Sequence, residues 1–363
     1  MKIDTNNIIG REIQTPPTGT AAQMTQTTHP ANGSFFVQVD GTPATDAAPV
    51  EIDKDLIFED SDIKDDVFLL ARGSANLFPL QNLSILKAQM KNGKTVAAVL
   101  FASAYLAGRW EGDEITTATA DGTPIDGGLL YIDTEQSPAD TKKIRRRITK
   151  LFAIARNGGT KGAGAGAGYT AADYAAAVDA LKARLIVANV RAYNVDTRRK
   201  KVAAMLARFT GTRFVIIDGV KDICKDFNNI ADVADTMDTL TNWALSYNVH
   251  ILCILHENPS SDKARGHLGT ELYNKATEII NVQQEKNDDG TKRNNFRVTW
   301  EAIRAGAGVE PVNFTRVNFG EIPADVPRFA LPLEVPTADT KTGGKTGAKP
   351  VQKNKSKVIE QNF

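Results

Sequence analysis

The chain has 363 residues, of which 42% are hydrophobic and 24% are charged, and its formal net charge is +1. This composition fits one large domain with flexible ends, or two small domains. The small net charge excludes a chain-wide basic field, so any contact with nucleic acid must come from a local patch. No apolar run approaches the roughly 18 residues that span a bilayer, and both cysteines, Cys224 and Cys253, lie in apolar stretches. We therefore expect a soluble, cytoplasmic protein with buried thiols and no membrane partner.

The composition changes along the chain and predicts three parts. Residues 1–50 are rich in Thr, Pro, Ala and Gln, which is typical of a disordered arm. Within this arm only residues 35–39 resemble a strand, which could dock on the core, on a neighbouring subunit or on a partner protein. Residues 331–363 are rich in Thr, Gly and Lys, so we expect a basic disordered tail. Residues 51–330 are then left as the folded domain.

The segment from Leu83 to Leu106 organises this domain. It reads as a short apolar strand, a polar loop that ends in Gly-Lys-Thr, and an alanine-rich helix, which is the context of a phosphate-binding P-loop. The first glycine of the usual motif is replaced by Ala88, which can enter such a loop if its φ stays negative. The residues that we expect to bind nucleotide are Ala88, Gln89, Met90, Lys91, Asn92, Gly93, Lys94 and Thr95.

The chemistry of phosphate binding explains these residue types. Backbone N–H groups of the loop and of the helix N-terminus would face the phosphates. Lys94 would place a positive charge near the β- and γ-phosphates, and the Thr95 hydroxyl would ligate Mg²⁺. An ordinary helix start with a lysine is the alternative interpretation. ATP and Mg²⁺ are thus the predicted ligands.

Strands and helices alternate after the P-loop. Apolar strands are predicted at 129–133, 185–188, 214–218 and 250–255, each followed by a helix, so the pattern predicts a mostly parallel sheet with helices on both faces. Shorter strands near 278–282, 296–300 and 313–317 are expected to be antiparallel or edge-like. Residues 111–128 are expected to be rich in turns.

Polar residues follow several of these strands. Because ligands gather at the carboxyl ends of parallel strands, Glu135, Asp218 and His256 are candidate catalytic residues beside Lys94. Asp218 would hold Mg²⁺, Glu135 would act as general base on the attacking water, and His256 would sense the γ-phosphate. Taken singly, each has a plainer alternative. Asp218 could be a turn acid or a helix cap, Glu135 could cap a helix, and His256 could be an ordinary loop residue.

Four segments carry a resemblance to a known family: LKAQMKNGKT (86–95), LLYIDTEQS (129–137), FVIIDGVKDI (214–223) and ILHENPSSDKARGHLGTEL (254–272). Together they resemble the RecA-fold P-loop ATPases of the plasmid RepA type, which occur on plasmids, phage and mobilisable elements. The resemblance covers about residues 80–320 and implies an α/β, RecA-like P-loop NTPase domain. The acid after the second strand, Glu135, is diagnostic, because RecA-like motors carry their base there, whereas many other P-loop ATPases place it beside the magnesium aspartate. In this chain Gly219 follows Asp218.

The resemblance also implies partners and a function. Motors of this kind form rings, usually hexamers, in which a neighbour's arginine completes the ATP site. Arg265 is the first candidate for this catalytic residue and Arg304 the second, although each could be a surface arginine. Single-stranded DNA would pass through the ring, where Lys263, Arg265 and His267 could also contact it.

The favoured function is therefore an ATP-hydrolysing motor on DNA, either a replicative helicase or an accessory ATPase of a plasmid, phage or mobilisable element. It would work with replication or mobilisation proteins. A regulatory or loader ATPase that does not unwind DNA is the alternative, and a non-hydrolysing nucleotide-binding scaffold is the third possibility. The basic helix 142–147 could be a DNA track, but such helices are more often solvated faces.

Overall fold

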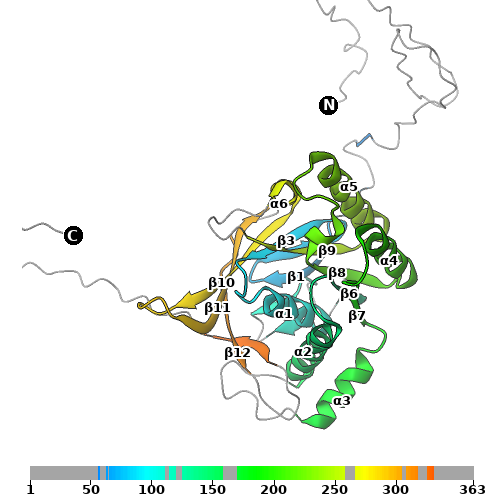
Figure 1. The fold of residues 1–363 in the computed structure, drawn as a ribbon. Helices are drawn as coiled ribbons and strands as arrows, with labels where there is room; N and C mark the ends of the chain where they lie inside the picture. Colours follow the sequence, from blue (N-terminus) through cyan, green and yellow to red (C-terminus); the bar gives the residue numbers. More distant parts are fainter. Residues whose placement is uncertain are drawn as a thin grey trace, which may run out of the picture. The chain divides into compact units, whose positions relative to one another are not determined.

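A computed structural model of the protein describes residues 56–57, 63, 65–110, 114–119, 125–157, 170–257, 266–304, 308–317 and 325–330. Contacts divide the chain into two units, Met1–Asp65 and Asp66–Phe363. The few described residues of the first unit form no helix or strand, so the architecture below is that of the second (Figure 1). The arm 1–50, the strand-like segment 35–39 and the tail 331–363 lie outside the described residues. The three-part division of the chain stays a prediction.

Within the described residues, nine strands form one mixed sheet in the order β13-β12-β11-β10-β3-β9-β8-β6-β7. The strands from β10 to β7 in this order are all parallel, and those from β13 to β10 are antiparallel. The bounds are β3 Leu83–Ala88, β6 Gly128–Asp133, β7 Leu185–Asn189, β8 Thr212–Asp218, β9 His250–His256, β10 Glu278–Lys286, β11 Lys292–Ile303, β12 Val312–Val317 and β13 Val326–Phe329. The mostly parallel sheet with an antiparallel C-terminal edge, predicted from the sequence, is confirmed.

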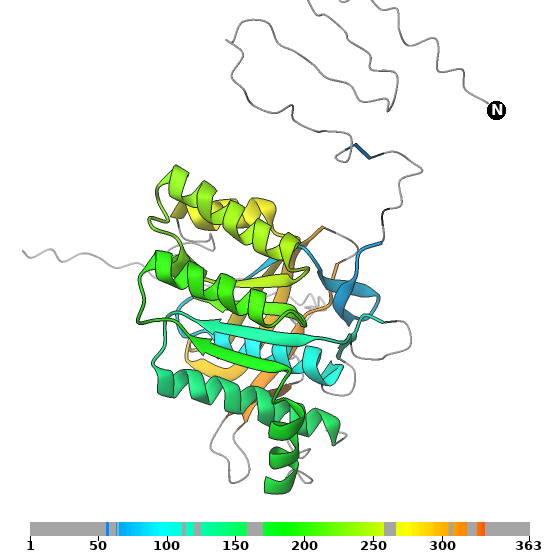
Figure 2. The ribbon, with the colours of Figure 1, turned by 90° about the vertical axis from the view of Figure 1, so that its right-hand side faces the viewer.

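Helices cover both faces of this sheet, as the alternating sequence pattern predicts. Figure 2 shows α4 and α5 on one side of the strands and α2 on the other. The helices are α1 Lys94–Ala107, α2 Pro138–Arg156, α3 Ala171–Ala180, α4 Val195–Arg208, α5 Ile230–Ser246 and α6 Gly266–Lys275, with a short 3₁₀ helix, η3, at Val220–Ile223. None of the helices in the described ranges is long and apolar enough to cross a membrane.

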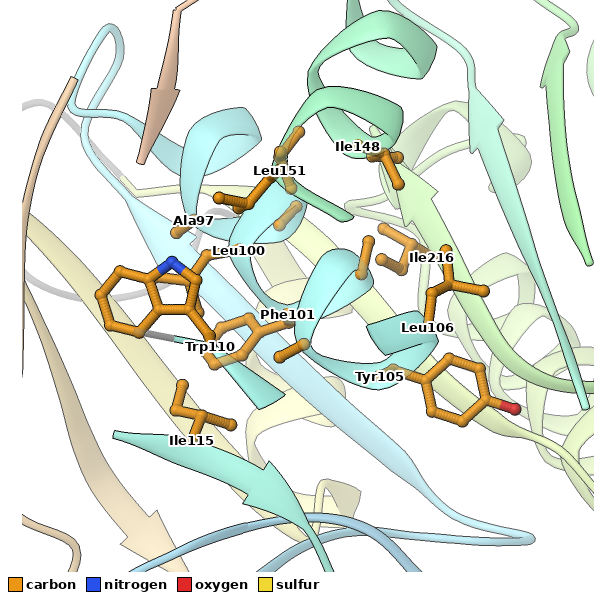
Figure 3. Close-up of a cluster of buried hydrophobic side chains, with 14 of the residues drawn as sticks. Ala97, Leu100, Phe101, Tyr105, Leu106, Trp110, Ile115, Ile148, Leu151 and Ile216 are labelled. Atoms are coloured by element: carbon orange, nitrogen blue, oxygen red, sulfur yellow. The ribbon is translucent and has the colours of Figure 1, made fainter. Parts of the chain in front are cut away.

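Helix α1 forms the centre of the larger core. Its alanine-rich sequence allows close packing on nearly every side, and left-handed glycines, Gly93 and Gly108, bound it at its two ends. Figure 3 shows Phe101 of α1 beside Trp110 and Ile115. All three of these side chains are buried. Helix α1 is therefore packed against the sheet over nearly its whole length, and this packing fixes the position of its N-terminus.

A second, small antiparallel sheet was not predicted. Strand β1 (Phe68–Arg72) pairs with β2 (Ala75–Pro79) and with β5 (Ile115–Thr117), which in turn pairs with β4 (Arg109–Trp110). The sequence indicated only turns at 111–128, where β5 lies. The short strands escaped detection because runs of two to five residues give too little periodicity to read.

The position of β10 also corrects the sequence prediction. We expected an edge-like or antiparallel strand near 278–282, but β10 lies inside the sheet and pairs in parallel with β3 from Glu278 to Asn281. Helix α6 precedes β10 and supplies the crossover that a parallel pair requires. Only its other neighbour, β11, is antiparallel to it.

Candidate functional site

The register of the sheet brings the predicted polar residues to one edge. Ala88, where the P-loop begins, lies opposite His256 in the β3–β9 pair. Asp133 at the end of β6 lies opposite Asp218 at the end of β8. Because all four strands are parallel, their carboxyl ends and the N-terminus of α1 face the same space.

The P-loop has the backbone shape that its sequence requires. Gly93 has a φ of 86°, and a Cβ placed on it would lie 2.7 Å from the Phe296 ring of β11, so glycine is needed for both reasons. Lys91 is also left-handed, with a φ of 65°, whereas Ala88 is not among the residues with positive φ. The alanine that replaces the first glycine is therefore compatible with the loop. Its carbonyl accepts hydrogen bonds from the Lys94 ammonium (3.3 Å) and from the Glu257 backbone N–H (3.1 Å).

Lys94, His256 and Glu135 form a continuous hydrogen-bonded chain. The Lys94 Nζ lies 2.9 Å from His256 Nδ1, and His256 Nε2 lies 3.2 Å from Glu135 Oε2. Since an ammonium only donates, Nδ1 accepts and Nε2–H donates to the carboxylate. Burial lowers the pKa of Lys94. The hydrogen bond from His256 holds the pKa of Glu135 below its usual value, which keeps this carboxylate ionised.

Asp218 is buried and closely surrounded by hydrogen-bond donors. Its Oδ2 accepts from the Tyr131 hydroxyl at 2.7 Å, from the Thr95 hydroxyl at 3.2 Å and from the Gln136 amide at 3.4 Å. Burial raises the pKa of Asp218 to about 6, because desolvation outweighs these bonds. A hydroxyl and a carboxylate are the hard oxygen ligands that Mg²⁺ accepts. Thr95 and Asp218 together therefore fit a magnesium ion.

The sequence analysis did not identify the residues that hold this arrangement in place. Asp133 accepts hydrogen bonds from the backbone N–H groups of Glu135 (3.0 Å) and Gln136 (2.9 Å), and from the Thr141 hydroxyl (2.6 Å). These bonds fix the turn that carries Glu135, two residues beyond the end of β6. The sequence does show Asp133 as a polar residue at the end of an aliphatic strand. Its hydrogen-bond partners, however, depend on the fold and could not be predicted.

A buried charge cluster lies beside the P-loop and was also missed. Lys87 of β3 is almost wholly buried and forms ion pairs with Glu257 (3.0 Å) and Glu301 (2.8 Å). Burial alone would lower the pKa of Lys87, but the two carboxylates outweigh it and raise the pKa, so the lysine stays charged. Asn281 of β10 bonds to both acids. The cluster ties β9, β3, β10 and β11 together directly behind the P-loop.

A cavity of about 650 Å³ opens at this edge. Glu135, His256 and Glu257 line it together with Gln89 and Met90 of the P-loop. Basic side chains, Arg191, Arg198 and Lys221, line it as well. Glu135, His256 and the P-loop thus share one solvent-accessible space with positively charged groups on its wall.

The two candidate arginines are placed differently. Arg265 lies outside the described residues, as does Lys263. Arg304 follows the end of β11, whose carboxyl end lies beside the amino end of β10 at Glu278. Its side chain donates to the Lys275 carbonyl at 3.4 Å. It therefore sits at the edge of the sheet opposite to the nucleotide loop of its own chain.

Much of the basic face of α2 is engaged within the chain. Arg145 donates to the Leu185 carbonyl at 2.8 Å, Arg147 pairs with Asp325 at 2.6 Å, and Lys143 pairs with Asp140 at 2.8 Å. These contacts show that several basic side chains of α2 bind groups of the same chain.

Comparison with known proteins gives an independent result. Residues 72–262 match the model of the AAA domain family, and this stretch is more than half of the chain. It contains the P-loop, Glu135, Asp218 and His256. No curated protein matches the sequence. The chain has a P-loop ATPase-like domain with an ATPase-type nucleotide-binding function, and it belongs to the AAA domain family.

Proposed function

We propose that this protein binds ATP with Mg²⁺ at the carboxyl edge of its sheet and hydrolyses it to ADP and phosphate. The observation that carries the proposal is the chain of contacts from Lys94 through His256 to Glu135. It joins the P-loop cation to a half-buried, ionised carboxylate, although Glu135 and His256 lie 121 positions apart in the sequence. Phosphoryl transfer to water needs both a phosphate ligand and a base, and these contacts bring one candidate for each together.

The residues have separate roles in this mechanism. Lys94 binds the phosphates and neutralises charge on them, exchanging its contact with His256 for one with substrate. Glu135 takes a proton from the attacking water, and its lowered pKa keeps it available as a base at neutral pH. His256 bridges the two and so responds to the presence of the γ-phosphate. Thr95 and Asp218 would hold Mg²⁺, which neutralises phosphate charge when bound.

The position of Glu135 in the sheet supports a RecA-like arrangement of the site. Glu135 follows β6, and β9 and β8 lie between that strand and β3 in the sheet. Asp218 ends β8 and is followed by Gly219, which cannot act as a base. The base is therefore separated from the magnesium residue in sequence, as the resemblance to plasmid RepA-type ATPases implies.

We further propose that the hydrolysis drives a motor on single-stranded DNA in the cytoplasm, in a ring that is most simply a hexamer. The resemblance supports a replicative helicase or an accessory ATPase of a plasmid, phage or mobilisable element, and AAA domains commonly form rings. A regulatory or loader ATPase is the second candidate. It is favoured by the net charge of +1 and by the engagement of Arg145 and Arg147 within the fold.

One experiment separates these functions. The ATPase rate is measured with and without single-stranded DNA, and the mass in solution is measured with and without ATP. DNA-stimulated turnover by a ring supports the motor, whereas turnover that is indifferent to DNA supports the regulator. An absence of turnover in every condition would leave only nucleotide binding.

Arg265 remains our candidate for the residue that acts on a neighbouring subunit's ATP. Such an arginine stabilises transition-state charge and can be worth about 10³-fold or more in rate. Two inactive variants, Arg265→Ala and Lys94→Ala, are mixed and allowed to exchange subunits. Partial recovery of activity is expected, because some junctions then combine an intact loop with an intact arginine. If mixing restores nothing although subunits exchange, Arg265 does not act in trans.

A further inference from the structure

Lys221 of η3 faces the oxygen of Glu135 that His256 does not use. Glu135 Oε2 is the acceptor for His256, whereas Oε1 is buried and has no hydrogen-bond partner among the described residues. The Lys221 ammonium lies 3.9 Å from this Oε1. Lys221 and Glu135 also line the same cavity. A carboxylate oxygen that is buried, charged and unbonded is costly unless a cation stands near it.

The turn that carries Lys221 is built against the residue before Glu135. The Thr134 hydroxyl lies within hydrogen-bond distance of the Asp218 carbonyl (2.9 Å), the Gly219 carbonyl (3.0 Å) and the Asp222 carboxylate (3.0 Å). Gly219 has a φ of 97°, and a Cβ on it would lie 2.5 Å from Glu135 Cγ, so glycine permits this close approach. The position of η3 relative to Glu135 is therefore fixed by several independent contacts.

Arg198 supports the same turn from the side of α4. The Arg198 guanidinium of α4 donates to the Asp222 carbonyl at 2.7 Å and to the Val190 carbonyl at 3.2 Å. It links the turn after β8 to the end of β7. The backbone of η3 thus has support on both sides, and the Lys221 side chain that it carries lines the cavity.

We propose that Lys221 is a positioning residue of the hydrolytic site, whose ammonium holds the buried Oε1 oxygen of Glu135 in place. His256 and Lys221 would then fix one carboxylate oxygen each, so that Glu135 has a single orientation toward the attacking water. This inference rests on the proposed role of Glu135 as base. It assigns Lys221 to the base and not to the binding of ATP.

Lys225 offers a matched control from the same segment of the chain. It pairs with Asp196 of α4 at 3.4 Å, and both side chains are more than half exposed. It is not among the residues that line the cavity. Removing its charge alters the net charge as much as removing that of Lys221, but leaves Glu135 untouched.

The test compares Lys221→Gln, Lys221→Arg and Lys225→Gln with the unmodified protein. For Lys221→Gln we expect kcat to fall by about tenfold or more, within the roughly 100-fold cost of a 1 Å misplacement, while KM for ATP stays within about twofold. Lys221→Arg should recover most of the rate, and Lys225→Gln should match the unmodified protein. An unchanged kcat in Lys221→Gln overturns the proposal. A raised KM with normal kcat also overturns it, because Lys221 would then bind ATP itself.

Crystal structures without nucleotide give a second readout that does not depend on turnover. In Lys221→Gln, the Glu135 carboxylate should move Oε1 out of its buried position or adopt more than one rotamer. An unmoved Glu135 in that variant contradicts the proposal. If the unmodified protein hydrolyses no ATP, the proposed function fails, but the orientation of Glu135 in the two crystals still decides the role of Lys221.

Discussion

Gly219→Ala tests how closely the turn after β8 must approach Glu135. Gly219 has a φ of 97°, and its added Cβ would lie 2.2 Å from Thr134 Oγ1 and 2.5 Å from Glu135 Cγ. The left-handed backbone costs an alanine roughly 1–2 kcal/mol, and overpacking adds about 1–3 kcal/mol. The free energy of unfolding should therefore fall by roughly 2–5 kcal/mol in Gly219→Ala.

Gly290→Ala isolates the backbone part of this cost. Gly290 has a φ of 80°, but nothing lies within 4 Å of the position of its Cβ. In Gly290→Ala the free energy of unfolding should therefore fall only by the backbone strain of roughly 1–2 kcal/mol. The melting temperature should then fall by a further 2–12 °C or so in Gly219→Ala, at about 2–4 °C per kcal/mol for a domain of this size.

Thermal unfolding followed by circular dichroism measures both variants, and ATP turnover is measured alongside. Because the new methyl group must displace Thr134 and Glu135, Gly219→Ala should lose hydrolysis, whereas Gly290→Ala should keep it. Equal losses of stability in the two variants would refute the close contact between the turn and Glu135. Normal turnover in Gly219→Ala would show that hydrolysis does not need this close contact with Glu135.

Three further predictions follow from the same geometry. Lys94→Ala should abolish hydrolysis and weaken binding of a fluorescent ATP analogue while the melting temperature stays within a few degrees, and normal turnover would contradict the P-loop assignment. Asp218→Asn should mainly raise the Mg²⁺ concentration needed for half-maximal turnover, and an unchanged requirement would show that Asp218 does not hold the metal. Burial raises the pKa of Glu278 to about 7, so its contribution to stability is complete below the unfolded pKa of about 4.5 and is lost as the pH rises through 7. The loss amounts to roughly 3 kcal/mol. Between pH 4.5 and 8, the free energy of unfolding measured with urea should therefore decline less in Glu278→Gln than in the unmodified protein. An identical decline would contradict the raised pKa of a buried Glu278.

The sequence predicted the parts of the fold that depend on local pattern. The order of strand, loop and helix around Gly93 was readable, and so were the apolar strands that precede Glu135, Asp218 and His256. The rule that parallel strands share a carboxyl edge then placed these residues together, and the structure brings them to that edge. Their catalytic roles stay predictions until activity is measured.

Features that depend on which strands become neighbours could not be read in this way. The position of β10 beside β3 is set by the crossover through α6, so the segment 278–282 looked like an edge strand in isolation. The Lys87 ion pairs join residues more than 150 positions apart. Lys221 looked like any loop lysine, because its closeness to Glu135 depends on the left-handed turn at Gly219.

ATP hydrolysis by Glu135→Gln tests the central assignment most directly. Glutamine keeps the size of the side chain and can still accept a hydrogen bond from His256, but it cannot take a proton from water at neutral pH. The variant should bind ATP and Mg²⁺ as the unmodified protein does, and its single-turnover rate should fall by about 10²-fold or more. A single-turnover rate equal to that of the unmodified protein would show that Glu135 is not the base.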